Sequence, residues 1–406
     1  MRILYLTFYF EPDLCAGSFR NTSLARELAQ QAKDLDCLIK VITTHPNRYS
    51  SFRRMAEDEE VFENLIIRRI DVSNHKSGFF DQIFSFMHYY SGVLKEIKDD
   101  RFDLVFASSS RLFTGYLGFK VAKKSKIPLY LDIRDLFPDT MNDILNIPFI
   151  VKNPIISYLK YLEKKVFTYA QHVNFISGGF NSHIKKYNLV NVTNFSHGID
   201  EEYIDIKSSE TTDRDYFVIT YAGNIGEGQG LHKIIPEAAE ILGSKYIFKI
   251  IGDGGQIGEL EYAIKEKNLN NVILEKPVSR EKLFKIYSES DYLFVHLNNY
   301  EVFEKVLPSK LFELGAFDKP IIAGVSGYAR TFIEEHFDNI ILFTPGDVQE
   351  FVEKINAYQY FTVRRNDFIS RFRRDNINRE MSSSILSYLI NQDQKTPQIH
   401  DRKESF

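Results

Sequence analysis

The sequence predicts an α/β protein of two domains, each built on a parallel β-sheet with helices on both faces. Through residue 200, short apolar runs alternate with longer amphipathic stretches, the pattern of strands joined by crossover helices. A polar segment without apolar periodicity, Lys207–Asp215 (KSSETTDRD), then interrupts the alternation, and the same pattern restarts after it. A chain of 406 residues is long enough for two such domains.

The strands of the first domain are expected where short runs of apolar residues recur. They are Ile3–Phe8, Leu38–Thr43, Leu65–Ile70, Leu104–Ala107, Leu129–Leu131, Val173–Ile176 and Val192–Phe195. Helical periodicity predicts the helices Ser18–Ala32, Phe80–Lys98, Phe113–Lys124 and Ile155–Ala170 between them.

The second domain repeats this order. Its expected strands are Phe217–Ala222, Tyr246–Ile251, Val272–Leu274, Tyr292–His296, Ile321–Ala323 and Ile340–Phe343. Its expected helices are Leu231–Leu242, Leu260–Lys267, Arg280–Ser290, Lys310–Phe317 and Val348–Tyr358.

These elements set the expected domain boundaries. Residues 1–206 would form the first domain and residues 215–362 the second, followed by helices over residues 363–390. We expect the polar residues 392–406 to form a disordered tail.

The composition excludes several classes of protein. A formal net charge of −4 and a pI near 6.2 argue against a general nucleic-acid binder, which needs a strong basic excess. Two cysteines, Cys15 and Cys37, make neither a disulfide framework nor a four-ligand zinc site, and they favour the cytoplasm. The first residues, MRILYLTFYFEPD, fit a β-strand better than a signal peptide, and we expect no membrane-spanning segment.

Ligands of open α/β sheets bind where the strands end, so the loops after strands are the candidate sites. The loop Tyr221–Gly230 (YAGNIGEGQG) follows a strand and precedes a helix, and its glycines allow the backbone to approach a ligand closely. We interpret it as a diphosphate cradle; a flexible loop is the alternative. Its candidate ligand-binding residues are Gly223, Asn224 and Gln229. Its glycines run G-x-x-G-x-G-x-G, which is not the dinucleotide motif G-x-G-x-x-G.

Two further loops follow strands of the second domain. Gly252 and Asp253 lie in the sequence IGDGG, which by itself is common turn chemistry. Val278 lies in the loop Glu275–Arg280, which can lie against a nucleobase or be an ordinary strand-to-helix connection.

The segment LPSKLFELGA gives the sharpest prediction. Pro308 and Ser309 mark a helix start, which places Lys310 in the first turn. A cation there opposes the helix dipole, and a bound diphosphate would explain it. Glu313 lies one turn deeper on a similar face, where its carboxylate can accept two hydrogen bonds from a ribose diol. The alternative is a surface i,i+3 ion pair. The candidate donor-binding residues here are Ser309, Lys310, Leu311 and Glu313.

Taken together, these segments resemble glycosyltransferase family 4. The resemblance rests on YAGNIGEGQGL, IGDGG and LPSKLFELGAFDKPII in this order, joined in the first half by FYFEPDLCAGSFR, LDIRDLFPD and FSHGID. It covers about residues 1 to 390. It implies the GT-B fold, in which two Rossmann-like domains face each other across a cleft. The first domain would bind the acceptor and the second the nucleotide sugar, and the last helices would pack back on the first domain.

The resemblance also implies roles for single residues. Glu313 matches the second acid of the family's E-x7-E motif, which binds the nucleotide ribose. The first acid is missing: the position eight residues earlier is Lys305, with Glu304 beside it. The family's basic residue before Gly230 is Gln229 here, and Lys310 is the candidate replacement. Gly17 matches the family's glycine near the donor phosphate.

The catalytic candidates lie mainly in the first domain. They are Asp132, Arg134, Asp135 and Glu304. For Asp132, an N-cap or a salt bridge to Arg134 is an equal alternative. The resemblance implies transfer with retention. Helix dipoles, backbone amides and Lys310 can stabilise a leaving diphosphate, so we expect no obligatory metal.

The resemblance is strongest to enzymes that build bacterial surface polysaccharides, including transferases of N-acetyl-L-fucosamine. It implies a UDP-sugar donor, a polyprenyl-diphosphate-linked acceptor in O-antigen or capsule (lipopolysaccharide or capsule polysaccharide) synthesis, and peripheral contact with the inner face of the cytoplasmic membrane. The aromatic segment Phe79–Tyr90 and the Lys-rich helix within Ile147–Tyr169 fit such a contact, or are core helices with lysine edges. The alternatives are a nucleotide-sugar epimerase, a dinucleotide-dependent oxidoreductase, and a non-catalytic binding homologue.

Overall fold

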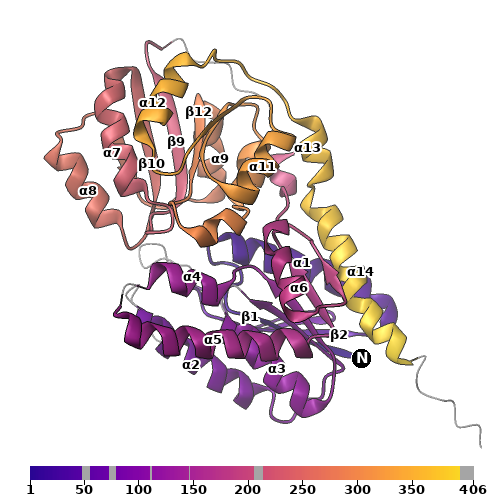
Figure 1. Ribbon diagram of the computed structural model, residues 1–406. Coiled ribbons are helices and arrows are strands. Elements are labelled where there is room, and N and C mark those ends of the chain that lie inside the picture. Colours follow the sequence, from indigo (N-terminus) through magenta and orange to yellow (C-terminus); the bar gives the residue numbers. More distant parts are fainter. Residues whose placement is uncertain (48–54, 73–78, 110–111, 146, 205–213, 394–406) are drawn as a thin grey trace, which may run out of the picture.

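The computed structural model describes residues 1–47, 55–72, 79–109, 112–145, 147–204 and 214–393. Two α/β domains lie one above the other, and a long C-terminal helix runs down the side of the molecule (Figure 1). The predicted polar linker falls largely on residues 205–213 and the predicted tail on residues 394–406, both outside the described residues.

The first domain contains an eight-stranded sheet. Its strands are β1 Arg2–Thr7, β2 Leu38–Thr44, β3 Glu59–Phe62, β4 Leu65–Ile70, β5 Leu104–Ser109, β6 Leu129–Ile133, β7 His172–Phe175 and β8 Val192–Thr193. The order is β3-β4-β2-β1-β5-β6-β7-β8, and every pairing except β3–β4 is parallel. Alternate residues of β1 enter different cores: Leu4 and Leu6 pack on one face, Ile3 and Tyr5 on the other. Burial on both faces is why this strand is a continuous apolar run.

Helices cover both faces of this sheet. They are α1 Ala16–Ala32, α2 Phe79–Glu96, α3 Leu112–Ser125, α4 Phe137–Ile144, α5 Phe149–Tyr169 and α6 Ser182–Tyr187. Helices α2, α3 and α5 supply apolar side chains to one core, while α1 packs on the opposite face.

The second domain has a six-stranded sheet that is parallel throughout its described strands. The strands are β9 Phe217–Asn224, β10 Tyr246–Asp253, β11 Val272–Glu275, β12 Tyr292–His296, β13 Ile321–Gly324 and β14 Ile340–Phe343, in the order β11-β10-β9-β12-β13-β14. The helices are α7 Leu231–Leu242, α8 Ile257–Glu266, α9 Arg280–Glu289, α10 Lys310–Gly315, α11 Gly327–His336 and α12 Val348–Ala357. Helices α7, α8 and α12 cover one face, and α9, α10 and α11 the other.

The chain then returns to the first domain through α13 Asn366–Arg371 and α14 Arg374–Asp393. Phe368 of α13 lies in the core of the second domain, whereas Met381 and Leu389 of α14 pack against α1. The arginines at this return make internal contacts: Arg365 donates to Lys319 O at 2.9 Å, and Arg374 pairs with Asp200. These two arginines therefore stabilise contacts within the protein.

Most predicted elements are present with ends shifted by a few residues, and the predicted α/β class is confirmed. The sequence patterns did not indicate β3, α4, α6 or α11. Strand β3 (EEVF) is mostly exposed and pairs only with β4 among the described strands, so it carries no apolar alternation. Helix α5 begins before Pro154 rather than after it. This is tolerated because residues 149–151 are exposed, which lets water reach the carbonyl that proline leaves unpaired.

Candidate functional site

A cavity of about 550 Å³ lies between the two domains, at the carboxyl edges of both sheets. In the first domain its walls come from the loops after β1 and β6, and in the second from the loops after β9, β10, β11 and β12. Strand order reverses at β1/β5 in one sheet and at β9/β12 in the other. These are the positions at which open α/β sheets bind their ligands.

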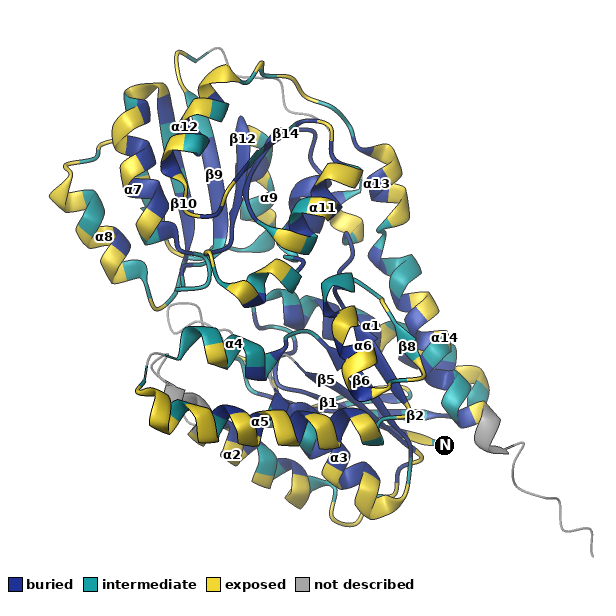
Figure 2. Cartoon of the chain, in the orientation of Figure 1, coloured by how far each residue is buried: buried dark blue, intermediate teal, exposed yellow. Residues whose placement is uncertain are grey.

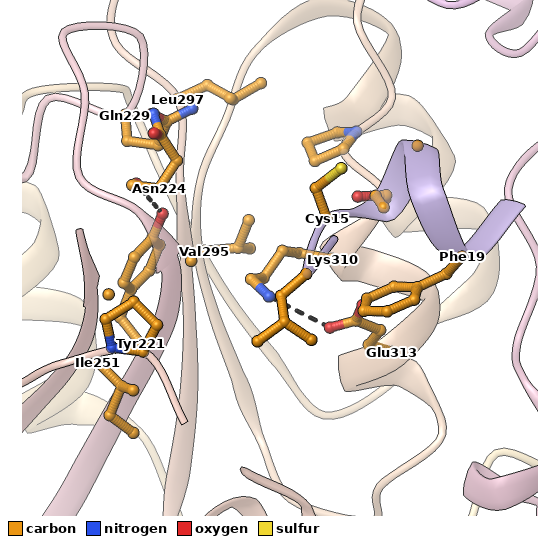
Figure 3. A pocket seen from close by; sticks show the side chains of 18 of the residues that line it. Cys15, Phe19, Tyr221, Asn224, Gln229, Ile251, Val295, Leu297, Lys310 and Glu313 are labelled. Carbon is orange, nitrogen blue, oxygen red and sulfur yellow. Dashed lines mark hydrogen bonds and ion pairs between the residues drawn. The ribbon is translucent and has the colours of Figure 1, made fainter. Parts of the chain in front are cut away.

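Lys310 and Glu313 lie side by side on one wall of this cavity (Figure 3). Lys310 Nζ is 3.2 Å from Glu313 Oε2, and their side chains are 22% and 15% exposed. Burial works to lower the pKa of the Lys310 ammonium, but the Glu313 carboxylate and neighbouring tyrosine oxygens outweigh it and hold this pKa well above its usual value. The i,i+3 pair is present, and it faces the cavity rather than the outer surface.

The glycine-rich loop after β9 contributes less backbone to the cavity than the sequence suggested. Gly223, Asn224 and Gln229 line it. A Cβ on Gly223 would lie 3.0 Å from Lys310 Cε, so this glycine makes room for the lysine. A Cβ on Gly228 would lie 3.0 Å from the ring of Phe303, so that glycine serves packing within the domain. The expected diphosphate cradle is therefore only in part a wall of the cavity.

His296, at the end of β12, fixes the position of this loop. Its Nδ1 lies 2.6 Å from Gln229 O, and its Nε2 accepts a hydrogen bond from Gly346 N at 3.1 Å. Burial lowers the pKa of His296 to about 4. The neutral ring with its proton on Nδ1 satisfies both partners at neutral pH.

Gly17 and Arg134 form part of the wall that the first domain provides. A Cβ on Gly17 would lie 2.0 Å from Arg134 Nη1, so a side chain at position 17 would displace this guanidinium. The Nε and Nη2 atoms of Arg134 are buried and have no hydrogen-bond partner among the described residues. Burial lowers the pKa of Arg134, and the nearby Asp132 charge offsets this in part.

Asp132 lies outside the lining of the cavity, so the structure does not support its predicted catalytic role. Its side chain is 0% exposed and pairs with Arg20, which is 1% exposed. The two guanidinium bonds measure 3.0 and 3.1 Å, and Ser108 and Asn174 donate to the same carboxylate at 3.0 and 2.8 Å. Burial works to raise the pKa of Asp132, but Arg20 and these hydrogen bonds outweigh it and lower the pKa. The partner of Asp132 is Arg20, not the predicted Arg134.

Glu304 also lies outside the cavity lining: it is exposed on the 3₁₀ turn Glu301–Lys305. Lys305 belongs to a contact between the domains. Its Nζ is 3.4 Å from Asp139 Oδ2, and its carbonyl accepts a hydrogen bond from Ser177 Oγ at 2.6 Å. The apolar side chains of Phe303 and Val306 line the cavity instead.

Comparison with known proteins relates part of the chain to a described family. Residues 183–373 match the family described as "Glycosyl transferases group 1". These residues form a group 1 glycosyltransferase domain. The "Putative colanic acid biosynthesis glycosyl transferase WcaI" of Escherichia coli (strain K12) is 29% identical over 124 residues. That match spans 30% of this chain and 30% of the WcaI sequence.

Solved structures similar to the whole chain confirm the two-domain GT-B fold around the group 1 domain. Sucrose-phosphate synthase from Thermosynechococcus elongatus has a TM-score of 0.66 at 11% identity, covering 97% of this chain and 98% of that one. Anabaena Alr3699/HepE has a TM-score of 0.64 at 14% identity, covering 95% and 100%. The lipopolysaccharide outer core galactosyltransferase WaaB has a TM-score of 0.61 at 14% identity, covering 95% and 99%.

The cavity brings together most of the predicted site residues, from the group 1 domain and from the first domain. Those that line it are Gly17, Arg134, Asp135, Gly223, Asn224, Gln229, Gly252, Val278, Ser309, Lys310 and Glu313. Asp135 accepts a hydrogen bond from Thr140 Oγ1 at 2.7 Å. Those that do not line it are Asp132, Asp253, Glu304 and Leu311, of which Leu311 is 0% exposed in the core.

Sequence reasoning missed Arg280 as a lining residue of the group 1 domain. Its Nη2 lies 2.5 Å from Asp200 Oδ2, and its guanidinium lies over the ring of Phe19 at 4.3 Å. A signal was present, because Arg280 is a cation in the first turn of α9, as Lys310 is in α10. The same helix-dipole argument applies to both.

Proposed function

We propose that the chain transfers a sugar from a UDP-sugar to a polyprenyl-diphosphate-linked saccharide in bacterial surface-polysaccharide synthesis, O-antigen or capsule, with retention of configuration. The observation that carries the proposal is the Lys310–Glu313 pair of the second domain, in an interdomain cavity that Gly17 and Arg134 line from the first domain. The alignment of a carboxylate and cations in one cavity suits a ligand with a diol and a diphosphate.

The Glu313 carboxylate would accept hydrogen bonds from the two ribose hydroxyls, and Lys310 would face the diphosphate. The ion pair orients both side chains before the ligand arrives, which reduces the entropy lost on binding. A similar structure supports the choice of nucleotide: Anabaena Alr3699/HepE was solved in complex with UDP and glucose. The name of the WcaI relative supports polysaccharide synthesis as the setting.

The transferred sugar would be an N-acetylated amino sugar, as in the N-acetyl-L-fucosamine transferases that the sequence resembles. In the reaction, the bond between the anomeric carbon and the diphosphate oxygen breaks, and its electron pair stays on UDP. The acceptor hydroxyl oxygen forms the new bond to that carbon, and its proton passes to the released UDP. Cations in the cavity would stabilise the charge that develops on UDP, so we propose that no metal is required.

A donor screen tests this function. The melting temperature of the purified protein, measured in EDTA, should rise with UDP and UDP-N-acetylhexosamines and rise less with GDP-, ADP- and dTDP-sugars. With a UDP-amino sugar and a polyprenyl-diphosphate-linked saccharide, the lipid product should gain one sugar with the donor's anomeric configuration.

Other outcomes of the same screen would contradict transfer. A released, epimerised free sugar would identify an epimerase. Binding without turnover over the whole panel of donors and lipid-linked acceptors would identify a non-catalytic homologue.

A surface on the first domain supports a lipid-linked acceptor. We call it the α5 patch: apolar side chains of α5 that are 51–85% exposed, namely Phe149 73%, Ile150 85%, Val151 52%, Tyr158 59% and Tyr161 51%. The exposed residues run along α5 (Figure 2). Lys160, Lys164 and Lys165 are exposed on the same helix, whose single acid, Glu163, is 2% exposed.

We propose that this patch lies on an anionic bilayer, although the chain as a whole is acidic. Apolar side chains beside lysines suit the boundary between headgroups and acyl chains. None of the described helices combines the length and apolar character of a membrane-crossing segment. The side chains of residues 79–83, at the start of α2, lie outside the described set.

Flotation with vesicles that contain phosphatidylglycerol tests the patch. The double variant Phe149→Ser/Ile150→Ser should lower the partition coefficient by at least about tenfold, because each apolar side chain contributes roughly 1.5–3 kcal/mol when buried. Val190→Ser, at a residue 90% exposed outside the patch, is the matched control and should partition as the wild type does. Equal flotation of both variants and the wild type would show that the patch does not contact lipid.

A further inference from the structure

We propose that Arg134 binds the donor diphosphate from the first domain, so that the diphosphate is held by two cations from opposite domains, Arg134 and Lys310. This inference rests on the nucleotide-sugar function proposed above. It deepens that function by assigning to the first domain a ligand for the leaving group.

The first observation is that the Arg134 guanidinium has no carboxylate partner among the described residues, whereas the other two cations of the cavity each have one. Among the described residues that line the cavity, the cations are Arg134, Arg280 and Lys310. Arg280 is held by Asp200 and Lys310 by Glu313. The Nε and Nη2 atoms of Arg134 are buried and have no hydrogen-bond partner in the part of the chain that the structure describes.

Asp132, two residues before Arg134, is not available to it. Both carboxylate oxygens of Asp132 accept hydrogen bonds from Arg20. In addition, Oδ2 accepts one from Ser108 and Oδ1 accepts one from Asn174. A buried guanidinium without an acceptor destabilises the folded protein, so its unused N–H groups indicate a bound ligand that accepts their hydrogen bonds. A diphosphate supplies oxygen acceptors of the right charge and geometry.

The second line of evidence is that the fold places Arg134 at a site suited to anions. The backbone N–H of Arg134 donates to Ser109 O at 3.0 Å, which fixes the chain at the end of β6. The side chain then reaches the first turn of α1, where a Cβ on Gly17 would lie 2.0 Å from Nη1. Helix α1 has 17 residues and no acid in its first turn, so the positive end of its dipole adds to the guanidinium charge.

The third line of evidence is that the glycine-rich loop brings no cation to the cavity. Of its side chains, Gln229 faces the cavity, and its Oε1 accepts a hydrogen bond from Asn224 Nδ2 at 2.7 Å. The charge of Lys310 is already shared with Glu313. Arg280, the other cation that the second domain brings to the cavity, is shared with Asp200. A diphosphate bound to the second domain alone would therefore remain under-neutralised.

This arrangement has a consequence for catalysis. When the bond between the sugar and the diphosphate breaks, negative charge grows on UDP, and Arg134 would stabilise it. The diphosphate would be fully neutralised only when the two domains stand as close as they do here.

Calorimetry with UDP and uridine, in buffer with EDTA, tests the role of Arg134. Arg134→Gln should weaken UDP binding about 10- to 100-fold, the loss expected for one charged hydrogen-bonded contact. Its affinity for uridine, which has no phosphate, should stay within about twofold of the wild type. Arg134→Lys should recover part of the UDP affinity. Arg330→Gln, which removes an exposed arginine of α11, is the matched control.

The melting temperature of the ligand-free protein separates this role from a structural one. Removing an unpartnered buried charge should leave the melting temperature of Arg134→Gln equal to or above that of the wild type. Equal losses of UDP and uridine affinity, or unchanged UDP affinity, would overturn the inference while leaving the proposed function standing. A wild-type protein that binds no uridine nucleotide and turns over no donor would overturn the proposed function itself.

Discussion

Replacing Glu313 by alanine is expected to lower the affinity for UDP by about 100-fold or more. The carboxylate would accept two hydrogen bonds from the ribose diol, and each hydrogen bond to a charged group contributes roughly 1.5–3 kcal/mol. Titration calorimetry measures the loss. Glu313→Gln should lose less, because an amide keeps the shape and one acceptor.

A modified ligand isolates the diol contact. The wild type should bind 2′,3′-dideoxy-UDP as weakly as Glu313→Ala binds UDP, and the variant should not distinguish the two ligands. Glu334→Gln is the control, because Glu334 pairs with Arg330 at 3.0 Å on the surface of α11. If Glu313→Ala still prefers UDP over the dideoxy ligand by the wild-type factor, the ribose contact is wrong.

Asp132→Asn is expected to lower the free energy of unfolding of the first domain by about 3–5 kcal/mol, the usual cost of leaving one partner of a buried pair uncompensated. Arg20 would keep its bonds to Phe195 O at 2.9 Å and Ser196 O at 2.6 Å, but its charge would lose its carboxylate. Denaturant unfolding followed by circular dichroism measures the effect. As a control, Glu334→Gln, which removes an exposed ion pair, should lower the free energy of unfolding by no more than about 1 kcal/mol.

The pH dependence of the same experiment has a definite sign. The pKa of Asp132 is lowered in the folded state, so its contribution is complete above the unfolded pKa of about 3.9 and is lost as the pH falls through the lower folded value. The difference between wild type and Asp132→Asn should be full at pH 7 and shrink in strong acid. A variant that unfolds like the wild type but loses turnover would restore the catalytic role for Asp132.

Local sequence patterns predict the ends of a strand best where both faces of the strand are buried. Strand β12, Tyr292–His296, is buried along its whole length and has the predicted ends, because strands packed on both sides read as short apolar runs between turns. The edge strand β3 is mostly exposed, and the helices α4 and α6 have eight and six residues, so the sequence shows no clear apolar periodicity there. The helix that begins at Lys310 was predictable from Pro308 and Ser309, and with it the approximate placement of Glu313.

The segment Asp132-Ile133-Arg134-Asp135 shows what only the tertiary structure decides. By itself, the sequence determined a two-domain α/β fold. It also showed that charged residues alternate in this segment, where a predicted strand ends. It offered Asp132 and Arg134 as partners of each other or as catalytic residues. The structure separates them: Asp132, still within β6, meets Arg20 of α1, while Arg134, just beyond the strand, faces the cavity. The physical reason is that a carboxylate at 0% exposure needs a cation beside it, and the fold supplies that cation from a helix 112 residues earlier.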